Sequence, residues 1–471
     1  MTIPLTATTV PPHLRVGDNC AKRETDRQGG RSSEGAERAA GARLGNKAIK
    51  SQQQVEVIDL QRRLWALHKT MWKITDYDRL RGCHRWIADG AGAASLRWHE
   101  PGRASWSSLC TSSSVWASPL SAAAIGKTRA VEVSTALDTW FKQGKQHSVE
   151  FLTLTLAHNR EQELKDVWDT LSYAWRGVVA GASWRGGKRY EGDKKRFGVQ
   201  HWIKSVEITH GANGWHVHLH VLLLLDKELT QDQRGALENN IYSRWSKAAQ
   251  RRGFKAPSRA HGVKLEKARK DKNAHDLGTY LAKGSIASVA ETLAQEMTAG
   301  QSSKEGRGAE NRTPFQILDS IRKSGDTSLK NPDVKIWRAW ETQSMGRRQI
   351  AWSKGTKDAL GVNAVSDEEA EQQGEETHTT VVVASVEYEE WNRAREDTGE
   401  KLRDDLNTRG DVVEYVAQAK TPGEAHKRAA TILRALKIRY QQADKPIPVD
   451  HVASVVLPVN KDQAWELLDV G

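Results

Sequence analysis

The chain contains the stretch Trp215-His216-Val217-His218-Leu219-His220-Val221, which continues into four leucines ending at Leu225. Successive side chains of a β-strand point to opposite faces of the sheet, so His216, His218 and His220 are predicted to share one face. The residues between them are apolar and would lie against a core. Imidazole is costly to bury unless it is paired, solvated or bound to a metal. Three histidines on one face therefore predict a metal or phosphate site.

A second strand, residues 202–209, precedes the histidine strand and is followed by a turn that contains Asn213-Gly214. This dipeptide is typical of two-residue hairpin loops, because both central residues of a type I′ turn have positive φ. With Asn213 and Gly214 as the loop, Thr209 would face His218 and Glu207 would face His220. A longer loop would change this register and leave Glu207 as an exposed strand residue. Imidazole and carboxylate together suit Mg²⁺ or Mn²⁺. The predicted ligands are His218, His220 and Glu207, with His216 as a further candidate.

A tyrosine and a lysine lie three residues apart, about sixty residues after the histidine strand. Asp276 is a suitable first residue for a helix, which would place Tyr280 and Lys283 on one helical face. A phenol has an ordinary pKa of about 10, so a nearby ammonium would favour the phenolate and stabilise negative charge on a phosphate. Tyr280 is therefore a candidate nucleophile.

The histidine strand followed by Tyr-x-x-Lys resembles motifs 2 and 3 of the HUH endonucleases, which include rolling-circle replication initiators and relaxases. Residues 151–156 resemble motif 1 of the same enzymes. Residues 312–318 and 346–355 resemble segments that follow the tyrosine helix in actinobacterial plasmid replication (Rep) proteins. The chain is therefore similar to that group over residues 80–360.

The resemblance implies a plasmid rolling-circle replication initiator, an enzyme that nicks one DNA strand and transfers it through a 5′-phosphotyrosine. Tyr280 would be the nucleophile, Lys283 would neutralise charge beside the phosphate, and the metal would be Mg²⁺ or Mn²⁺. Position 284 is glycine where two-tyrosine initiators carry their second tyrosine, which implies termination by an activated water or a second subunit. The expected partners are the plasmid double-strand origin, single-stranded at the nick, and a host helicase and polymerase.

Relatives of this group carry a cysteine-rich segment, Val-Trp-Ala-Cys-Pro-x-Cys, that resembles a metal knuckle. The matching segment here, residues 114–121, reads SVWASPLS. Serine cannot replace a thiolate in a structural zinc site, and Cys83, His84 and Cys110 make a poor ligand set. Zinc is therefore not expected.

Three other interpretations of the function stay open. A relaxase or transposase of the HUH class would form the same covalent bond for a different purpose. The alternating histidines also resemble the histidine-triad nucleotide hydrolases, in which His218 would be the nucleophile and no tyrosine would be needed. If the site is structural, the protein binds DNA without catalysis. The basic charge and Tyr280 favour the endonuclease.

The composition agrees with a nucleic-acid partner. There are 71 Lys and Arg against 59 Asp and Glu, which gives a net charge of +12 and a pI of about 9.4; such a balance favours polyanions. Trp184 and Trp202 flank basic segments and are candidates for stacking on unpaired bases. Three cysteines, with neither an apolar span nor a signal-peptide core, indicate a cytoplasmic protein without a membrane anchor. The candidate phosphate contacts are Arg185, Lys188, Arg189, Lys194, Lys195, Arg196, Arg251 and Arg252.

The order of predicted elements indicates an α+β fold with an antiparallel sheet. Strands are predicted at 149–157, 202–209, 215–225 and 261–268, with helices at 160–180 and 229–250. The resemblance implies a ferredoxin-like or RNA-recognition-like HUH core with accessory regions on both sides. The predicted organisation is a disordered basic arm (1–50), an N-terminal region with a degenerate knuckle (51–140), the endonuclease domain (141–300), a family-specific extension (301–360), an acidic linker (361–377) and a C-terminal accessory domain (378–471).

Overall fold

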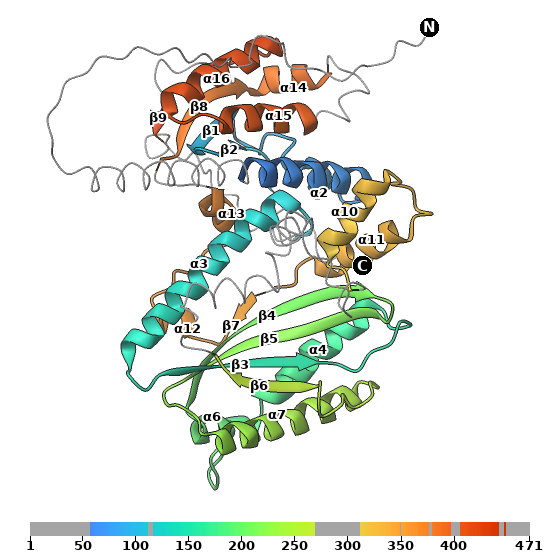
Figure 1. Cartoon of the computed structure of the whole chain (residues 1–471), viewed down its shortest axis with the longest axis vertical. Helices are drawn as coiled ribbons and strands as arrows, with labels where there is room; N and C mark the ends of the chain where they lie inside the picture. The colour runs from blue at the N-terminus through green and yellow to red at the C-terminus, as the bar shows by residue number, and fades with distance from the viewer. Residues whose placement is uncertain are drawn as a thin grey trace, which may run out of the picture. The chain divides into compact units, whose positions relative to one another are not determined.

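Figure 1 shows the computed structural model of the chain, which describes residues 57–111, 116–268, 311–348, 350–375, 379–396, 406–441 and 447–448. All of these residues belong to the compact unit Gln53–Gly471. The basic arm predicted for residues 1–50 lies outside the described residues. Helices and antiparallel sheets build the described part, so the predicted α+β class is confirmed.

The larger sheet has five strands in the order β6-β3-β5-β4-β7, and each neighbouring pair is antiparallel. Along the chain, its first four strands follow the order strand, helix, strand, strand, helix, strand. This connection with this strand order is the ferredoxin-like arrangement. The fifth strand comes from the predicted family-specific extension. The elements are β3 (Ser148–Thr155), α4 (Leu164–Val179), β4 (Val199–Gly211), β5 (Gly214–Leu225), α7 (Gln231–Arg251), β6 (Val263–Lys267) and β7 (Ile350–Trp352).

One face of this sheet packs against α4 and α7 (Figure 1). Val217 and Leu219 of β5 are almost fully buried, and Trp175 of α4 meets Trp202 of β4 with 5.2 Å between ring centroids. Trp202 thus packs partly against the core. The apolar residues of α4 recur three and four positions apart, which turns one side of the helix to the sheet. The histidines of β5 point to the opposite face.

A buried ion pair joins the sheet to its helical layer. The Glu150 side chain of β3 is 0% exposed and accepts hydrogen bonds from Nε and Nη2 of Arg234 in α7, at 2.7 and 2.9 Å. A bidentate guanidinium matches the geometry of a carboxylate and satisfies both of its oxygens. This pair fixes the start of α7 against β3.

A second sheet, in the order β2-β1-β8-β9, combines segments from both ends of the described chain. Strand β1 pairs with β8 in antiparallel register, with Ala93 opposite Glu387. A separate hydrophobic core lies between this sheet and its helices. The predicted N-terminal region and the predicted C-terminal accessory domain are therefore not independent, because they share this sheet. The elements are β1 (Ala93–Glu100), β2 (Arg103–Ser107), β8 (Val381–Glu387), α14 (Tyr388–Glu396), α15 (Leu406–Ala417), α16 (Pro422–Ala435) and β9 (Ile447–Pro448).

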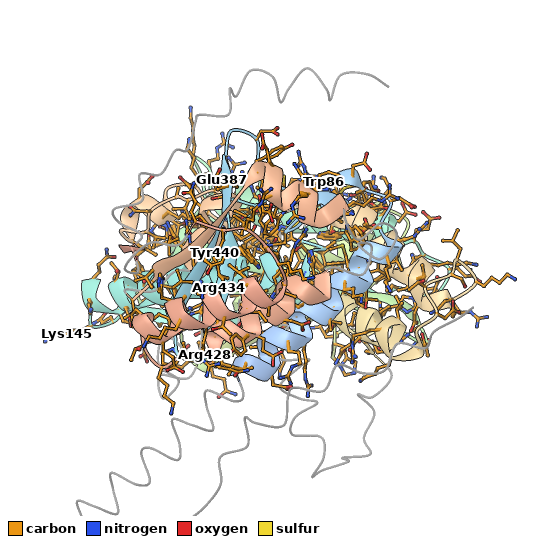
Figure 2. All side chains as sticks on the ribbon, turned by 90° about the horizontal axis from the view of Figure 1, so that it is seen from above. Trp86, Lys145, Glu387, Arg428, Arg434 and Tyr440 are labelled. Atoms are coloured by element: carbon orange, nitrogen blue, oxygen red, sulfur yellow. The ribbon has the colours of Figure 1, made fainter. Side chains whose placement is uncertain are left out.

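Figure 2 shows side chains of this second sheet and its helices, with Arg428 and Arg434 along α16 and Tyr440 after it. Nε of Arg428 donates to Glu424 at 3.0 Å, and its guanidinium carbon lies 5.0 Å from the centre of the Tyr415 ring. The hydroxyl of Tyr440 donates to the carbonyl of Ala430 at 3.5 Å. These contacts hold α16 to α15 and to the segment that follows it.

The predicted acidic linker contains a packed helix, α13 (Asp367–Glu375), which lies against α3 (Pro119–Gln143). Arg129 of α3 donates to the Asp367 carboxylate at 2.7 Å, and the Thr128 hydroxyl donates to the carbonyl of Ala370 at 2.6 Å. The segment is therefore part of the fold and not a linker, because Asp367 pairs with Arg129 of α3 and the buried Glu371 lies 3.0 Å from His84.

The other described helices are α2 (Asp78–Gly82), α5 (Ala182–Arg185), α6 (Asp193–Arg196), α10 (Pro314–Ser324), α11 (Pro332–Ser344) and α12 (Thr356–Ala359), and residues 57–74 are also helical. Among the described residues, no helix combines the length and the apolar character needed to cross a bilayer.

Candidate active site

The β4–β5 hairpin has a different register from the predicted one. Gly211 pairs with Gly214, so Ala212 and Asn213 form the turn. Both of these residues have negative φ, whereas Gly214 has a φ of +81°. A two-residue turn followed by a glycine with positive φ is typical of a three-residue hairpin loop, which here consists of Ala212, Asn213 and Gly214. The prediction that Asn213 and Gly214 form the loop is therefore wrong, and the pairing moves by two residues.

Glu207 nevertheless shares a face with the three histidines. It lies opposite His218, not opposite His220 as predicted, and Thr209 lies opposite His216. A two-residue change of register leaves every side chain on its original face. Glu207 reaches diagonally to His220, where its Oε2 atom lies 2.7 Å from Nε2 of the imidazole. The structure therefore brings together all four residues predicted as candidate ligands.

Two threonines of β3 contact His218 and His220 on this face. Thr153 lies opposite His220 and Thr155 lies opposite His218. Each threonine hydroxyl is 3.4 Å from Nδ1 of its histidine. With Nδ1 engaged in this way, Nε2 is the ring atom directed toward other groups. Sequence reasoning missed both threonines, although they occupy alternate positions in the segment that resembles motif 1.

A fourth imidazole, that of His158, also belongs to this cluster. Its Nε2 atom lies 2.9 Å from Nδ1 of His216, and the two rings are 4.2 Å apart at 82°. His158 follows β3 in the chain and was not predicted. Its position three residues after Thr155 is a weak sequence signal. That signal points to the site only when β3 is known to pair with the histidine strand β5.

Burial dominates the electrostatics of the cluster. Burial lowers the pKa of His216 and the pKa of His218. The charges of His220 and His216 lower the pKa of His218 further, whereas the Glu207 carboxylate acts in the opposite direction. Burial alone would raise the pKa of Glu207, but the hydrogen bond from His220 and the charges of His220 and His218 outweigh it and lower the pKa. An ionised carboxylate and neutral imidazoles are the protonation states that bind a cation.

The donor atoms of Glu207 and the three histidines decide whether they could hold a divalent metal. Among the described residues, no three His, Cys, Asp or Glu side chains are arranged as a ready set of ligands. Glu207 and His220 instead bind each other at 2.7 Å, and a cation would have to replace that hydrogen bond. Carboxylate and imidazole suit Mn²⁺ and also Mg²⁺ with bound waters. The donor types of Glu207 and the histidines therefore fit a divalent cation. In the structure, Glu207 and His220 are joined to each other by a hydrogen bond.

A family described as replication protein matches residues 116–398, which is more than half of the 471 residues. The chain belongs to this family of replication proteins. A relative from Streptomyces lividans, named Protein rep, is 26% identical over 304 residues, which cover 55% of this chain and 65% of the relative. The match thus spans slightly less than two thirds of that relative. No solved structure gives a significant match. The expected resemblance to actinobacterial Rep proteins is confirmed.

The predicted nucleophile of this replication protein, Tyr280, and its neighbour Lys283 lie outside the described residues. The described chain ends on one side at residue 268, directly after β6, and continues at residue 311. Strand β6 pairs with β3 and places Lys264 opposite Thr153. The segment with the tyrosine motif therefore follows a strand that lies next to the one bearing Thr153 and Thr155.

The predicted phosphate contacts of this replication protein lie in the connection between α4 and β4 and at the end of α7. Helix α6 is tied to α7 by Arg244, which donates to Asp193 at 2.6 Å. The connection forms an open pocket of about 380 Å³, whose lining includes exposed Tyr190. Trp184 is only 4% exposed, so the prediction that it stacks on bases is wrong, because its ring packs in the core. The pocket is also lined by Arg185, Lys188, Arg189 and Lys195. Lys194 and Arg196 are exposed in the same connection, and Arg251 and Arg252 are exposed at the end of α7.

The described part of the predicted knuckle remnant, residues 116–121, leads into the start of α3. Ser118 is the N-cap, and its hydroxyl accepts from the backbone N–H of Ser121 at 3.2 Å. The Sγ atom of Cys83 lies 3.6 Å from both serine hydroxyls. Nε2 of His84 is 3.2 Å from the Ser121 hydroxyl and 3.0 Å from Glu371. Cys110 instead contacts the carbonyl of Ile87 at 3.8 Å. The residues at this position thus form a buried hydrogen-bonded cluster.

Proposed function

We propose that this replication protein is a metal-dependent, site-specific endonuclease that starts rolling-circle replication of a plasmid by nicking one strand of its origin. The observation that carries the proposal is the single face on which His216, His218, His220 and Glu207 converge, with Glu207 and His220 2.7 Å apart. Membership of the replication protein family and the Tyr-x-x-Lys motif support it.

In this proposal the Tyr280 oxygen attacks the scissile phosphorus in line with the departing 3′ oxygen. The bond to the 3′ oxygen breaks, the phenolic proton is lost, and the 3′ oxygen gains a proton to become a hydroxyl that a polymerase can extend. The 5′ end stays linked to the tyrosine, and this ester conserves the energy for later rejoining. Lys283 neutralises negative charge at the phosphate.

His218, His220 and Glu207 would hold the divalent cation, with His216 as a further ligand or in place of Glu207. Mg²⁺ or Mn²⁺ bound there would polarise the phosphate. The side chains of β3 would keep the imidazoles in place. Because position 284 is glycine, we propose that termination uses an activated water or a second subunit.

The proposed substrate is the plasmid double-strand origin, presented as a single strand at the nick, as the resemblance to rolling-circle replication initiators implies. The basic side chains after α4 and at the end of α7 would hold the DNA backbone through its phosphates. A host helicase and polymerase would then act at the exposed 3′ end. We propose that these steps occur in the cytoplasm. The family match favours replication over a relaxase or transposase role.

A nicking assay on supercoiled plasmid that carries the cognate origin tests this function. The protein with Mn²⁺ or Mg²⁺ should produce open circles, and excess EDTA should stop the reaction until metal is restored. His218→Ala and His220→Ala should each abolish nicking while far-UV circular dichroism and DNA binding are retained. Full nicking in excess chelator would exclude the metal-dependent mechanism, and hydrolysis of nucleotides without any nicking would exclude the endonuclease.

A further inference from the structure

His158 lies beside the histidine strand, although it belongs to the loop that follows β3. Its Nε2 atom is 2.9 Å from Nδ1 of His216, and the rings meet nearly edge to face at 82°. A hydrogen bond between two neutral imidazoles contains one proton, so one ring donates and the other accepts. The pair therefore fixes the orientation of the His216 ring and couples the tautomers of the two rings.

The loop that carries His158 is held by contacts that do not involve its imidazole. Asn159 Oδ1 accepts from the backbone N–H of Glu161 at 3.0 Å, and Gln162 Oε1 accepts from the N–H of Asn159 at 2.9 Å. The backbone also lies close to Gly214, where an added Cβ would come within 2.8 Å of Cα in Arg160. The His158 side chain can therefore be replaced while these contacts keep the loop against the hairpin.

The geometry of His216 sets the direction of this hydrogen bond when the ring binds a cation. Nδ1 of His216 faces His158, so Nε2 of His216 is the ring atom left for a cation. A ligating nitrogen needs a free lone pair, which requires the proton of neutral His216 to be on Nδ1. Nδ1 of His216 is then the donor, and Nε2 of His158 is the acceptor.

We infer that His158 is a positioning residue, which accepts the Nδ1 proton of His216 and thereby presents the Nε2 lone pair of His216 on the face that carries His218 and His220. The inference rests on the proposed function and deepens it, because it makes His216 a donor for the divalent cation in addition to Glu207. Outer partners that accept the second ring proton of a ligating histidine fix its tautomer and raise its affinity for the metal.

Nitrogen NMR of the histidine rings tests the pair without any metal. In the full-length, metal-free protein labelled with ¹⁵N-histidine, His216 is identified by the signals lost in His216→Gln. We expect a protonated Nδ1 on His216 in the wild type and in His158→Gln, whose side-chain carbonyl can accept the same proton. His158→Phe should move the proton to Nε2 or give a mixture. A wild-type His216 protonated on Nε2, or one that is unchanged in His158→Phe, overturns the inference.

Titration with Mn²⁺ alone, followed by electron paramagnetic resonance, tests the consequence for metal binding. His158→Phe should weaken Mn²⁺ binding about 10- to 100-fold, and His158→Gln should weaken it less. The matched control is His147→Phe, since His147 stacks on Trp140 with 3.8 Å between ring centroids and should have no effect. An altered His216 tautomer with unchanged Mn²⁺ affinity overturns the positioning role.

The two measurements separate this inference from the proposed function. A wild type that binds no Mn²⁺ contradicts the metal-dependent endonuclease, while the tautomer of His216 still tests the His158 pair. Circular dichroism and thermal unfolding establish that each variant is folded. If His158→Phe does not fold, the tautomer of the wild type and the comparison of His158→Gln with His147→Phe decide the question.

Discussion

Nε2 of His220 lies 2.7 Å from Oε2 of Glu207, although the two residues are not opposite each other in the hairpin. The bond is diagonal, because Glu207 pairs with His218 and reaches across to the next histidine on the same face. It keeps an ionised carboxylate beside an imidazole on a partly exposed sheet face. This contact is the part of the cluster that a divalent cation would replace.

The first prediction concerns this carboxylate. Glu207→Ala should weaken Mn²⁺ affinity about 10- to 100-fold, the effect typical of losing a group in a metal's coordination environment. Thr209→Ala is the matched control, because Thr209 lies on the same face opposite His216 and should matter less. Affinities are measured by calorimetric titration of the protein with MnCl₂. Equal, negligible losses in both variants would assign the third-ligand role to His216 instead.

The second prediction concerns the nucleophile. Tyr280→Phe keeps the ring but removes the attacking oxygen, so nicking of a single-stranded origin oligonucleotide should stop while the protein still binds it. The wild type should form an SDS-stable adduct that carries label from the 5′ side of the nick. Tyr242→Phe is the control, since the Tyr242 hydroxyl donates to the carbonyl of Pro257 at 2.9 Å; the adduct should persist in it. Peptide mapping that places the adduct on Tyr242 or Tyr173 would refute the motif assignment.

The third prediction concerns the basic connection after α4. Replacing both Lys188 and Arg189 by alanine should weaken binding of a single-stranded oligonucleotide and reduce the slope of log affinity against log salt by about 1 to 1.5, as expected for two lost phosphate contacts. Lys165→Ala is the control, because the Lys165 ammonium is already paired with Asp169 at 2.8 Å. Fluorescence anisotropy at several salt concentrations measures both quantities. An unchanged slope in the double variant would remove this loop from the DNA-binding surface.

The fourth prediction concerns the pH dependence of stability. Glu341 of α11 is 1% exposed. Burial raises its pKa to about 7, and the charge of Arg338 opposes this effect only in part. A raised carboxyl pKa means that the folded state holds the proton more tightly than the unfolded state. The stability contributed by this group is therefore complete below its unfolded value of about 4.5 and is lost as the pH rises through 7.

Glu341→Gln should remove this dependence. The wild-type free energy of unfolding should fall relative to that of the variant between pH 4.5 and 7, by on the order of 3 kcal/mol. Urea denaturation across this pH range measures the difference. Glu389→Gln, at an exposed position of α14, should follow the wild type. Parallel curves for the wild type and Glu341→Gln would show that the carboxyl titrates at its ordinary pKa.

The shared face of the histidines could be predicted because it depends only on strand alternation. The register could not, because Asn213-Gly214 fits two different loops. In the structure only Gly214 takes positive φ, and the pairing moves by two residues, so Glu207 keeps its face but changes its partner. His158 was missed for a different reason. Its role depends on the contact between the loop after β3 and His216. The local sequence around His158 does not predict that contact.

The sequence by itself determined the ferredoxin-like order of strands and helices, the face that carries the histidines and the family resemblance, because these follow from local periodicity and short motifs. Only the tertiary structure decided that β1 and β8 form one sheet across nearly three hundred residues of chain, and that α13 packs on α3 through Arg129. It also decided that His158 meets His216. Contacts between distant segments depend on which surfaces bury each other, and the pattern of a single segment does not specify its partner.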